Sequence, residues 1–243
     1  MKKYYTLFIA LLLSVVLTAC LDKEKPQETT KENTTETTEN SDAEGTENTS
    51  AGNDSGSDEI TDIKYGVSNI PSTLKGYKGK PVAAATWIDA NGENVIVITE
   101  TETSSKPGQY GDLQSKELYG HHYIMTGDKS EELWKIQDFV KECDFDLRLT
   151  YVPESLTITD LDDDGIAEST FLYNMSCKSD VSPDDLKLMM HENKNKYALR
   201  GYTYIKAVDA GGDYKVDAAF NDAPSSFLDY AKQQWKKHKD FEY

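Results

Sequence analysis

Beyond residue 60 the chain is built from short runs in which apolar and polar residues alternate, the pattern of half-buried β-strands. Pro81–Ile88 and Asn94–Thr101 are the clearest pair, and they flank a segment that ends in Asn91 and Gly92. Both residue types accept positive φ, so this step favours a tight hairpin turn. Further strands are predicted at Glu117–Met125, Glu132–Phe139, Phe145–Tyr151, Ser155–Thr159, Glu168–Met175, Leu186–His191 and Tyr197–Lys206.

Turn residues recur between these strands. They are Gly127 with Asp128, Asp163–Gly165, Asn193 with Lys194, and Gly211 with Gly212. Short strands at this spacing predict a mainly β fold, an antiparallel meander of the sandwich, barrel or propeller-like kind. The pattern does not choose among these.

The last segment of the chain has a helical period instead. Phe227, Ala231 and Trp235 recur at helical spacing, and Ser226 with Asp229 fits a capping box at the start. The cations within Lys236–Lys239 suit a helix C-terminus. We therefore predict a C-terminal α-helix.

The N-terminus reads as an export signal. Lys2 and Lys3 precede the apolar run Leu7–Leu17, which is shorter than the roughly 20 residues of a transmembrane helix and is followed by a strongly polar segment. The sequence LTAC at residues 17–20 resembles the lipobox of bacterial lipoproteins. That resemblance implies cleavage before Cys20, lipidation of its thiol and a stable membrane anchor of two or three acyl chains. An ordinary secretory signal with a chance cysteine is the alternative.

The segment Asp22–Glu59 has no aromatic or large aliphatic residue, and it carries twelve acidic and three basic residues. It cannot bury enough apolar surface to offset the entropy of ordering, so we predict a disordered acidic tether. An export signal for the outer surface, suggested by LDKEK after Cys20, is the second interpretation. The predicted organisation is a signal peptide at 1–19, a lipidated tether at 20–60 and a β-rich domain at 61–243.

Charge and cysteine content limit the function. The net charge of −17 leaves about ten negative charges on the domain, which makes nucleic acid an unlikely partner. Of three cysteines, Cys143 and Cys177 remain once Cys20 is assigned to lipid. In an oxidising compartment this pair most simply forms a disulfide, and two buried thiols are the alternative.

The segment DLDDDGIAE at residues 160–168 is the one motif with chemical content. Its carboxylates stand at alternate positions, where they repel one another unless a cation lies between them. Hard oxygen donors in this number suit calcium, while an acidic turn selected for solubility is the alternative. The predicted ligands are the side chains of Asp160, Asp162, Asp164 and Glu168 and the carbonyl oxygen of Ile166.

This loop resembles the calcium hairpin of integrin-like FG-GAP propeller repeats, with Glu168 where that family more often has aspartate. The longer run 156–205 resembles a family of mostly uncharacterised lipoproteins from Bacteroidetes-type bacteria. There a DxDxDGxxE hairpin is followed by Cys, DVSP and KYALRG, here Cys177, residues 180–183 and residues 196–201. Some members are labelled surface polysaccharide biosynthesis, which names no reaction.

Enzymatic motifs are absent: the sequence has no G-x-S-x-G, P-loop, H-E-x-x-H or Rossmann glycine pattern. His191 and Glu192 begin like a zinc helix, but Asn195 replaces the second histidine. His121 and His122 should face opposite sides of one strand as half-exposed residues.

Two classes of function follow. The first is a membrane-anchored periplasmic or surface lipoprotein whose calcium-binding β domain is a binding or structural component of the envelope, with a glycan or an envelope protein as partner. The second is a part, enzymatic or not, in surface-polysaccharide biosynthesis or assembly.

Overall fold

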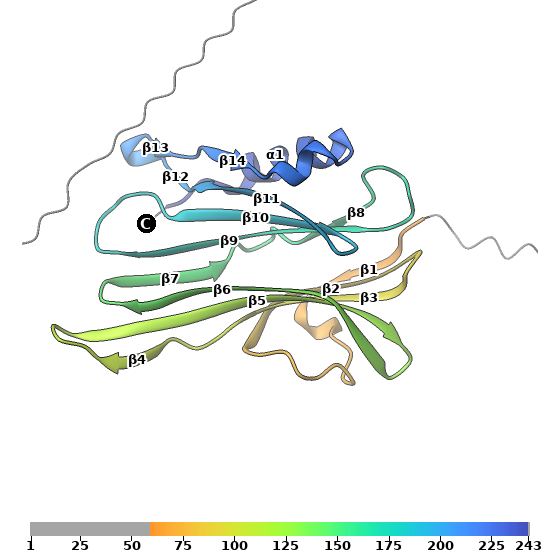
Figure 1. The fold of residues 1–243 in the computed structure, drawn as a ribbon, viewed down its shortest axis with the longest axis horizontal. Coiled ribbons are helices and arrows are strands. Elements are labelled where there is room, and N and C mark those ends of the chain that lie inside the picture. The colour runs from red at the N-terminus through yellow and green to blue at the C-terminus, as the bar shows by residue number, and fades with distance from the viewer. Residues whose placement is uncertain (1–58, 243) are drawn as a thin grey trace, which may run out of the picture. The chain divides into compact units, whose positions relative to one another are not determined.

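The computed structural model describes residues 59–242, so the signal peptide, Cys20 and the tether up to residue 58 lie outside the described residues. Two antiparallel sheets stack face to face, and one α-helix lies on the outer side of the second sheet (Figure 1). The predicted antiparallel β fold with a C-terminal helix is confirmed, and it is a sandwich. Within residues 59–242 no helix combines the length and hydrophobicity needed to cross a membrane.

The first sheet has six strands. The long strand β5 pairs with β3 and β4 along one edge and with β6 along the other, while β1 and β2 extend the sheet beyond β3. The strands are β1 Thr61–Tyr65, β2 Lys80–Asp89, β3 Gly92–Glu100, β4 Ser104–Pro107, β5 Asp112–Thr126 and β6 Lys129–Cys143.

The second sheet also has six strands. Here β9 pairs with β10 along one edge and with both β7 and β8 along the other, and β11 and β14 follow β10. The strands are β7 Asp146–Tyr151, β8 Thr157–Thr159, β9 Glu168–Lys178, β10 Asp185–Glu192, β11 Asn195–Tyr202 and β14 Tyr214–Val216. A small pair, β12 Tyr204–Ile205 and β13 Ala210–Gly211, and the 3₁₀ turns Val67–Asn69, Lys206–Val208 and Ala218–Asn221 complete the described chain before α1 Ser225–His238.

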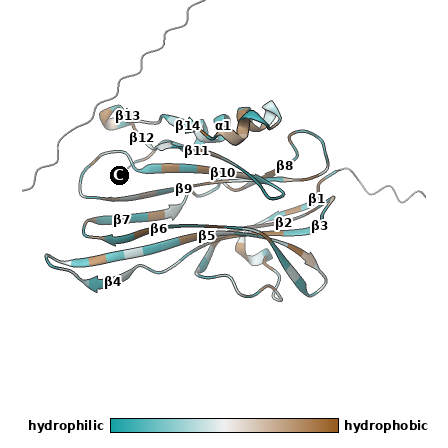
Figure 2. Cartoon of the chain, in the orientation of Figure 1, coloured by the Kyte–Doolittle hydropathy of each residue, from teal (hydrophilic) through white to brown (hydrophobic). Residues whose placement is uncertain are grey.

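The main core lies between the sheets, and it explains why apolar residues alternate along the strands (Figure 2). Ile96 and Ile98 of β3 point into it, while Val95 and Val97 point to the outer face. That outer face is covered by Leu74, so β3 is buried on both sides. Burial on both faces is the reason that this strand reads as a continuous apolar run.

Helix α1 covers the outer face of the second sheet. Phe227, Ala231 and Trp235 are buried as predicted and pack with the leucines of β10 and β11. The predicted capping box is wrong: Pro224 is the N-cap residue, no side chain caps the helix, and Ser226 lies inside its first turn. Proline supplies a fixed backbone angle before the first turn, where the helix has N–H groups without intrahelical partners in any case.

Several predicted boundaries shift. The hairpin of β2 and β3 forms as predicted, with Gly92 at a φ of 101°. The predicted strand Tyr197–Lys206 is interrupted at Thr203, whose N–H donates to the carbonyl of Asp184 and leaves the ladder. The predicted strand Ser155–Thr159 begins only at Thr157, as β8. Ser155 belongs to a turn instead, because its hydroxyl donates a hydrogen bond to the carbonyl of Val152.

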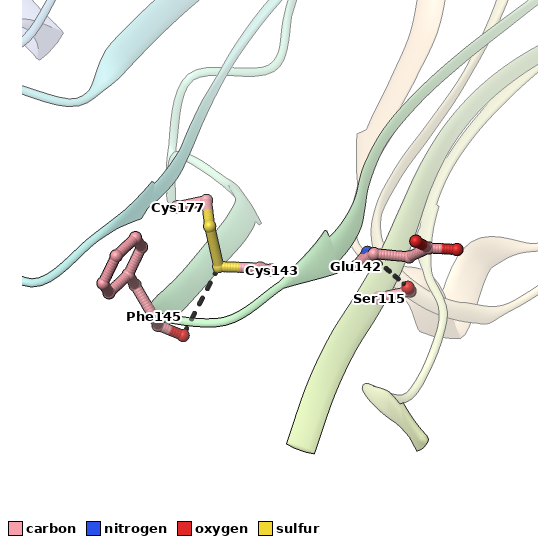
Figure 3. Close-up of a disulfide and its surroundings, with 5 residues drawn as sticks. All are labelled: Ser115, Glu142, Cys143, Phe145 and Cys177. Carbon is pink, nitrogen blue, oxygen red and sulfur yellow. Dashed lines mark hydrogen bonds between the residues drawn. A yellow bond between two sulfur atoms is a disulfide. The ribbon is translucent and has the colours of Figure 1, made fainter. Parts of the chain in front are cut away.

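A disulfide joins Cys143, the last residue of β6, to Cys177 of β9, with their Cα atoms 5.6 Å apart (Figure 3). The predicted pairing is confirmed, and it links the two sheets. Cys143 Sγ lies 3.4 Å from the carbonyl oxygen of Phe145. This is a close contact and not a hydrogen bond, because a disulfide sulfur carries no hydrogen to donate.

A β-bulge makes this link geometrically feasible. Val140 pairs with Lys116 and Cys143 with Gln114, so β6 has one more residue than β5 over this stretch. Without the extra residue Cys143 would face away from the core, since side chains alternate with a period of two. Glu142, at a φ of 54°, absorbs the distortion, and its N–H donates to the hydroxyl of Ser115 (Figure 3).

Candidate metal site

The acidic segment is the loop of the β8–β9 hairpin. Thr159 pairs with Glu168, so the loop residues 160–167 are closed at their base by the strand ladder. Asp163 and Gly165 take positive φ values of 59° and 78°. Glycine tolerates that conformation freely and aspartate better than most residues, so the local sequence suits a tight, strongly curved loop.

Hydrogen bonds inside the loop orient its carboxylates. Asp160 accepts bonds from the backbone N–H groups of Asp164 and Gly165, both at 3.1 Å. Asp164 in turn accepts one from the N–H of Ile166 at 2.8 Å. Each carboxylate keeps lone pairs free of these bonds, because an ionised carboxylate has about four acceptor sites.

Asp89, the last residue of β2, connects the loop to the neighbouring β2–β3 hairpin. This buried carboxylate ties the β2–β3 hairpin to the acidic loop, and a second bond at 2.9 Å runs from Ala90 N–H to the carbonyl of Gly165. The oxygens of Asp89 accept hydrogen bonds of 2.8 to 3.2 Å from Trp87 Nε1, Asn91 N, Asn94 Nδ2 and Ala167 N. The loop is therefore bonded to a buried carboxylate whose two oxygens each accept two hydrogen bonds.

The carboxylates gather into two overlapping sets. In the first, one oxygen each from Asp160, Asp162 and Glu168 lie within 4.8 Å of one another. In the second, the same holds for Asp162, Asp164 and Glu192. The predicted residues Asp160, Asp162, Asp164 and Glu168 are thus brought together, whereas the Ile166 carbonyl stays a predicted ligand.

Glu192 is a member that sequence reasoning missed. It ends β10 and stands directly opposite Glu168 in the ladder of β9 and β10. Like charges in that position destabilise a sheet unless something compensates them. In the sequence, Glu192 stands only at the end of a predicted strand, next to the Asn193–Lys194 turn. Its proximity to the acidic loop becomes visible only when the pairing of β9 with β10 is known.

Glu168 is the most unusual group of the cluster. Its side chain is fully buried; Oε2 accepts bonds from Thr159 Oγ1 and Leu161 N–H at 3.0 Å, but Oε1 has no hydrogen-bond partner among the described residues. Burial, with a smaller contribution from the charge of Asp162, raises the pKa of Glu168 to about 8. A buried oxygen without a partner is costly, and either a proton or a cation at this atom would reduce that cost.

Burial and mutual repulsion act on the other carboxylates too. The pKa of Asp162 is raised by burial and then by the charges of Asp164 and Asp160. The pKa of Glu192 is raised by burial and then by Asp164 and Asp162. Each of these costs would fall if a cation lay between the groups.

The donor set consists of oxygen atoms, which suits hard cations. Each of the two sets offers three carboxylates, one oxygen from each, that could hold such an ion. Oxygen donors alone do not distinguish calcium from other hard cations.

The histidines do not join this cluster. His121 and His122 face opposite sides of β5 as predicted: His121 Nδ1 lies 3.1 Å from Glu132 Oε1, and His122 Nε2–H donates a hydrogen bond of 2.9 Å to Asn94 Oδ1 inside the sandwich. The expectation of half-exposed side chains is wrong, since both are at most 3 % exposed. His191 is also buried and stacks on Trp134 at 3.9 Å, because β10 is a central strand of its sheet.

Comparisons of the chain with protein-family models, with curated proteins and with solved structures found no match.

Proposed function

We propose that this protein is a lipoprotein of the bacterial envelope whose β-sandwich domain binds calcium at the Asp160–Glu168 hairpin. Lipidated Cys20 anchors it to a membrane, and the sandwich serves as a binding or structural component on the periplasmic or outer side. The observation that carries the calcium proposal is Glu168 Oε1, a buried oxygen with no hydrogen-bond partner among the described residues, within a cluster of carboxylates.

General coordination chemistry is the reason for proposing calcium and not magnesium. Calcium accepts six to eight oxygen ligands in irregular arrangements, whereas magnesium demands a near-ideal octahedron and gives up its water reluctantly. The loop and Glu192 together offer two overlapping carboxylate sets, and therefore several oxygen donors. Binding in the range of extracellular calcium modules, about 0.1 to 1 mM, is expected.

Export is supported by two independent features. The LTAC sequence at residues 17–20 follows a signal-like apolar run. The Cys143–Cys177 disulfide fits an oxidising compartment outside the cytoplasm.

Calorimetric titration of the purified full-length chain with calcium and with magnesium tests the cation proposal. Wild type should bind calcium and bind magnesium more weakly. Glu168→Gln replaces the unpartnered oxygen with an uncharged amide and should weaken calcium binding by roughly tenfold or more. Asp163→Asn is the matched control: Asp163 belongs to the same loop but to neither carboxylate set, and asparagine tolerates its φ of 59°. Unchanged calcium binding in Glu168→Gln, or equal losses in both variants, would overturn the proposal.

A further inference from the structure

The turn between β2 and β3 contacts both of the segments that carry the acidic cluster. Its first contact is with the loop between β8 and β9. The N–H of Ala90 donates a hydrogen bond of 2.9 Å to the carbonyl of Gly165, and Asp89 accepts one of 3.2 Å from the N–H of Ala167. The first sheet therefore holds the part of this loop that leads into β9.

The second contact is a hydrogen bond between two asparagine side chains. Asn91 Nδ2 donates to Asn193 Oδ1 at 2.9 Å, across 102 positions of the chain. Asn193 belongs to the turn between β10 and β11 and directly follows Glu192, a member of the second carboxylate set. The bond thus ties a turn of the first sheet to the end of the hairpin that carries Glu192.

Neither turn requires an asparagine for its own conformation. In the β2–β3 turn the positive φ is taken by Gly92, and Asn91 has no positive φ. In the β10–β11 turn Asn193 has a φ of 48°, a conformation that glycine adopts more freely. Both asparagines are half-buried, where an amide is stabilised by a hydrogen-bond partner. The bond between them therefore accounts for an amide at both positions.

Repulsion within the acidic cluster acts against this arrangement. One oxygen each from Asp162, Asp164 and Glu192 lie within 4.8 Å of one another. Like charges at that distance repel, so without a cation they push the β10–β11 turn away from the acidic loop. The hydrogen bonds of the β2–β3 turn oppose that displacement, because they join the loop and the neighbouring turn to one element.

We propose that Asn91 and Asn193 are positioning residues of the calcium site, and that their hydrogen bond holds Glu192 beside the acidic loop before calcium binds. A site assembled in advance binds more tightly, because the ion does not have to supply the free energy that brings the repelling groups together. Without the bond the β10–β11 turn moves away in the calcium-free protein, and the calcium affinity falls although every ligand is still present. The inference rests on the calcium site proposed above.

Calorimetric titration of the purified full-length chain with calcium measures this effect. Asn91→Ala and Asn193→Gly each remove the bond from one side, and glycine adopts the φ of 48° without strain. Each variant should bind calcium roughly three- to tenfold more weakly than wild type, the range expected for one hydrogen bond. The double variant should lose no more than either single variant, because each change already removes the same bond.

A second background separates positioning from general damage to the fold. Glu192→Gln removes the charge that the bond holds in place, so Asn193→Gly should change the calcium affinity by less than about twofold in that background. Asn69→Ala is the matched control: it removes an amide hydrogen bond of 2.8 Å, to the carbonyl of Tyr65, and should leave the calcium affinity unchanged. All titrations are made well below the melting temperature of each variant in chelator, so that unfolding does not contribute.

The outcomes distinguish this inference from the proposed function. A wild type that binds no calcium would overturn the proposed function and this inference with it. A wild type that binds calcium, with the same affinity in Asn91→Ala and Asn193→Gly, would overturn the inference alone. Losses that add in the double variant, that equal a loss in Asn69→Ala, or that persist in full in the Glu192→Gln background would also overturn it.

Discussion

Two buried carboxylates of this protein, Asp89 and Glu168, differ in how many of their oxygens have a hydrogen-bond donor. Asp89 has hydrogen-bond donors for both of its oxygens, supplied by its own hairpin and by Ala167. Glu168 has donors for one oxygen only. The difference cannot be predicted from the sequence, because the partners of Asp89 include a residue from a distant hairpin. The alternating aspartates were sufficient to locate the loop, whereas Asp89 and Glu192 became visible only through strand pairing.

Glu192 gives a prediction that the loop motif alone would not make. Glu192→Gln removes one carboxylate from the second set and should weaken calcium binding by roughly tenfold. It also removes the repulsion that Asp164 and Asp162 exert on this carboxylate, so the melting temperature in chelator should stay the same or rise slightly. Calorimetry and thermal melts measure the two effects. A variant that binds calcium like wild type would remove Glu192 from the site.

His122 predicts how stability depends on pH. Burial lowers the pKa of His122 from 6.5 to about 4. Between these values the unfolded chain binds a proton that the folded chain does not, so the free energy of unfolding decreases as the pH falls through this window, by at most about 1.4 kcal/mol per pH unit for this residue. His191, whose pKa burial lowers to about 3, acts in the same direction.

His122→Phe should therefore flatten this dependence. Phenylalanine keeps an aromatic ring between Trp87 and Trp134 but cannot be protonated. Urea unfolding at several pH values between 4.5 and 7 gives the slope of stability against pH for both proteins. A variant with the wild-type slope would show that His122 does not titrate in this way.

At the scale of elements, the hairpins could be predicted from the sequence, whereas the β-bulge and the short outer strands could not. The strand positions followed from alternation, and the β2–β3 turn followed from Asn91 and Gly92. The bulge at Glu142 was not predictable, because its cause is the requirement that Cys143 face the second sheet. The short strands β1, β4, β13 and β14 lack a clear apolar pattern, since their side chains are mostly exposed.

The disulfide between the sheets should contribute strongly to stability. Cys143 and Cys177 are 34 residues apart, which corresponds to roughly 3 to 4 kcal/mol in the chain-entropy treatment. Cys143→Ser with Cys177→Ser should lower the free energy of unfolding by about this amount, as should a reductant added to wild type. Urea unfolding measures both. A reductant that leaves the wild-type midpoint unchanged would contradict the expected contribution.

At the scale of the whole molecule, the sequence predicted the antiparallel β class and could not select the sandwich. The choice depends on which sheet faces pack together, and those contacts join residues far apart in the chain, such as Trp134 of β6 and His191 of β10. The predicted helix did indicate that one sheet has an apolar outer face, because the stripe of Phe227, Ala231 and Trp235 needs an apolar surface to cover.

Anchorage is a prediction about the intact protein. Cys20→Ala should abolish incorporation of labelled palmitate and leave a larger, unprocessed precursor, because the thiol is the proposed site of lipidation. Metabolic labelling and membrane fractionation in the producing bacterium measure this. A variant that still incorporates palmitate and fractionates with membranes would refute the anchor.

Thermal unfolding of the full-length chain in calcium, magnesium and chelator tests the central claim, that calcium stabilises this sandwich. A few millimolar calcium should stabilise wild type by about 1 to 2 kcal/mol, which corresponds to a rise of about 3 to 6 °C in the melting temperature. Magnesium should do less. Asp162 belongs to both carboxylate sets, so Asp162→Ala should remove the calcium-dependent rise while leaving the melting temperature in chelator nearly unchanged. Equal wild-type melting temperatures in calcium and in chelator would contradict the account and identify the loop as an acidic turn without a metal.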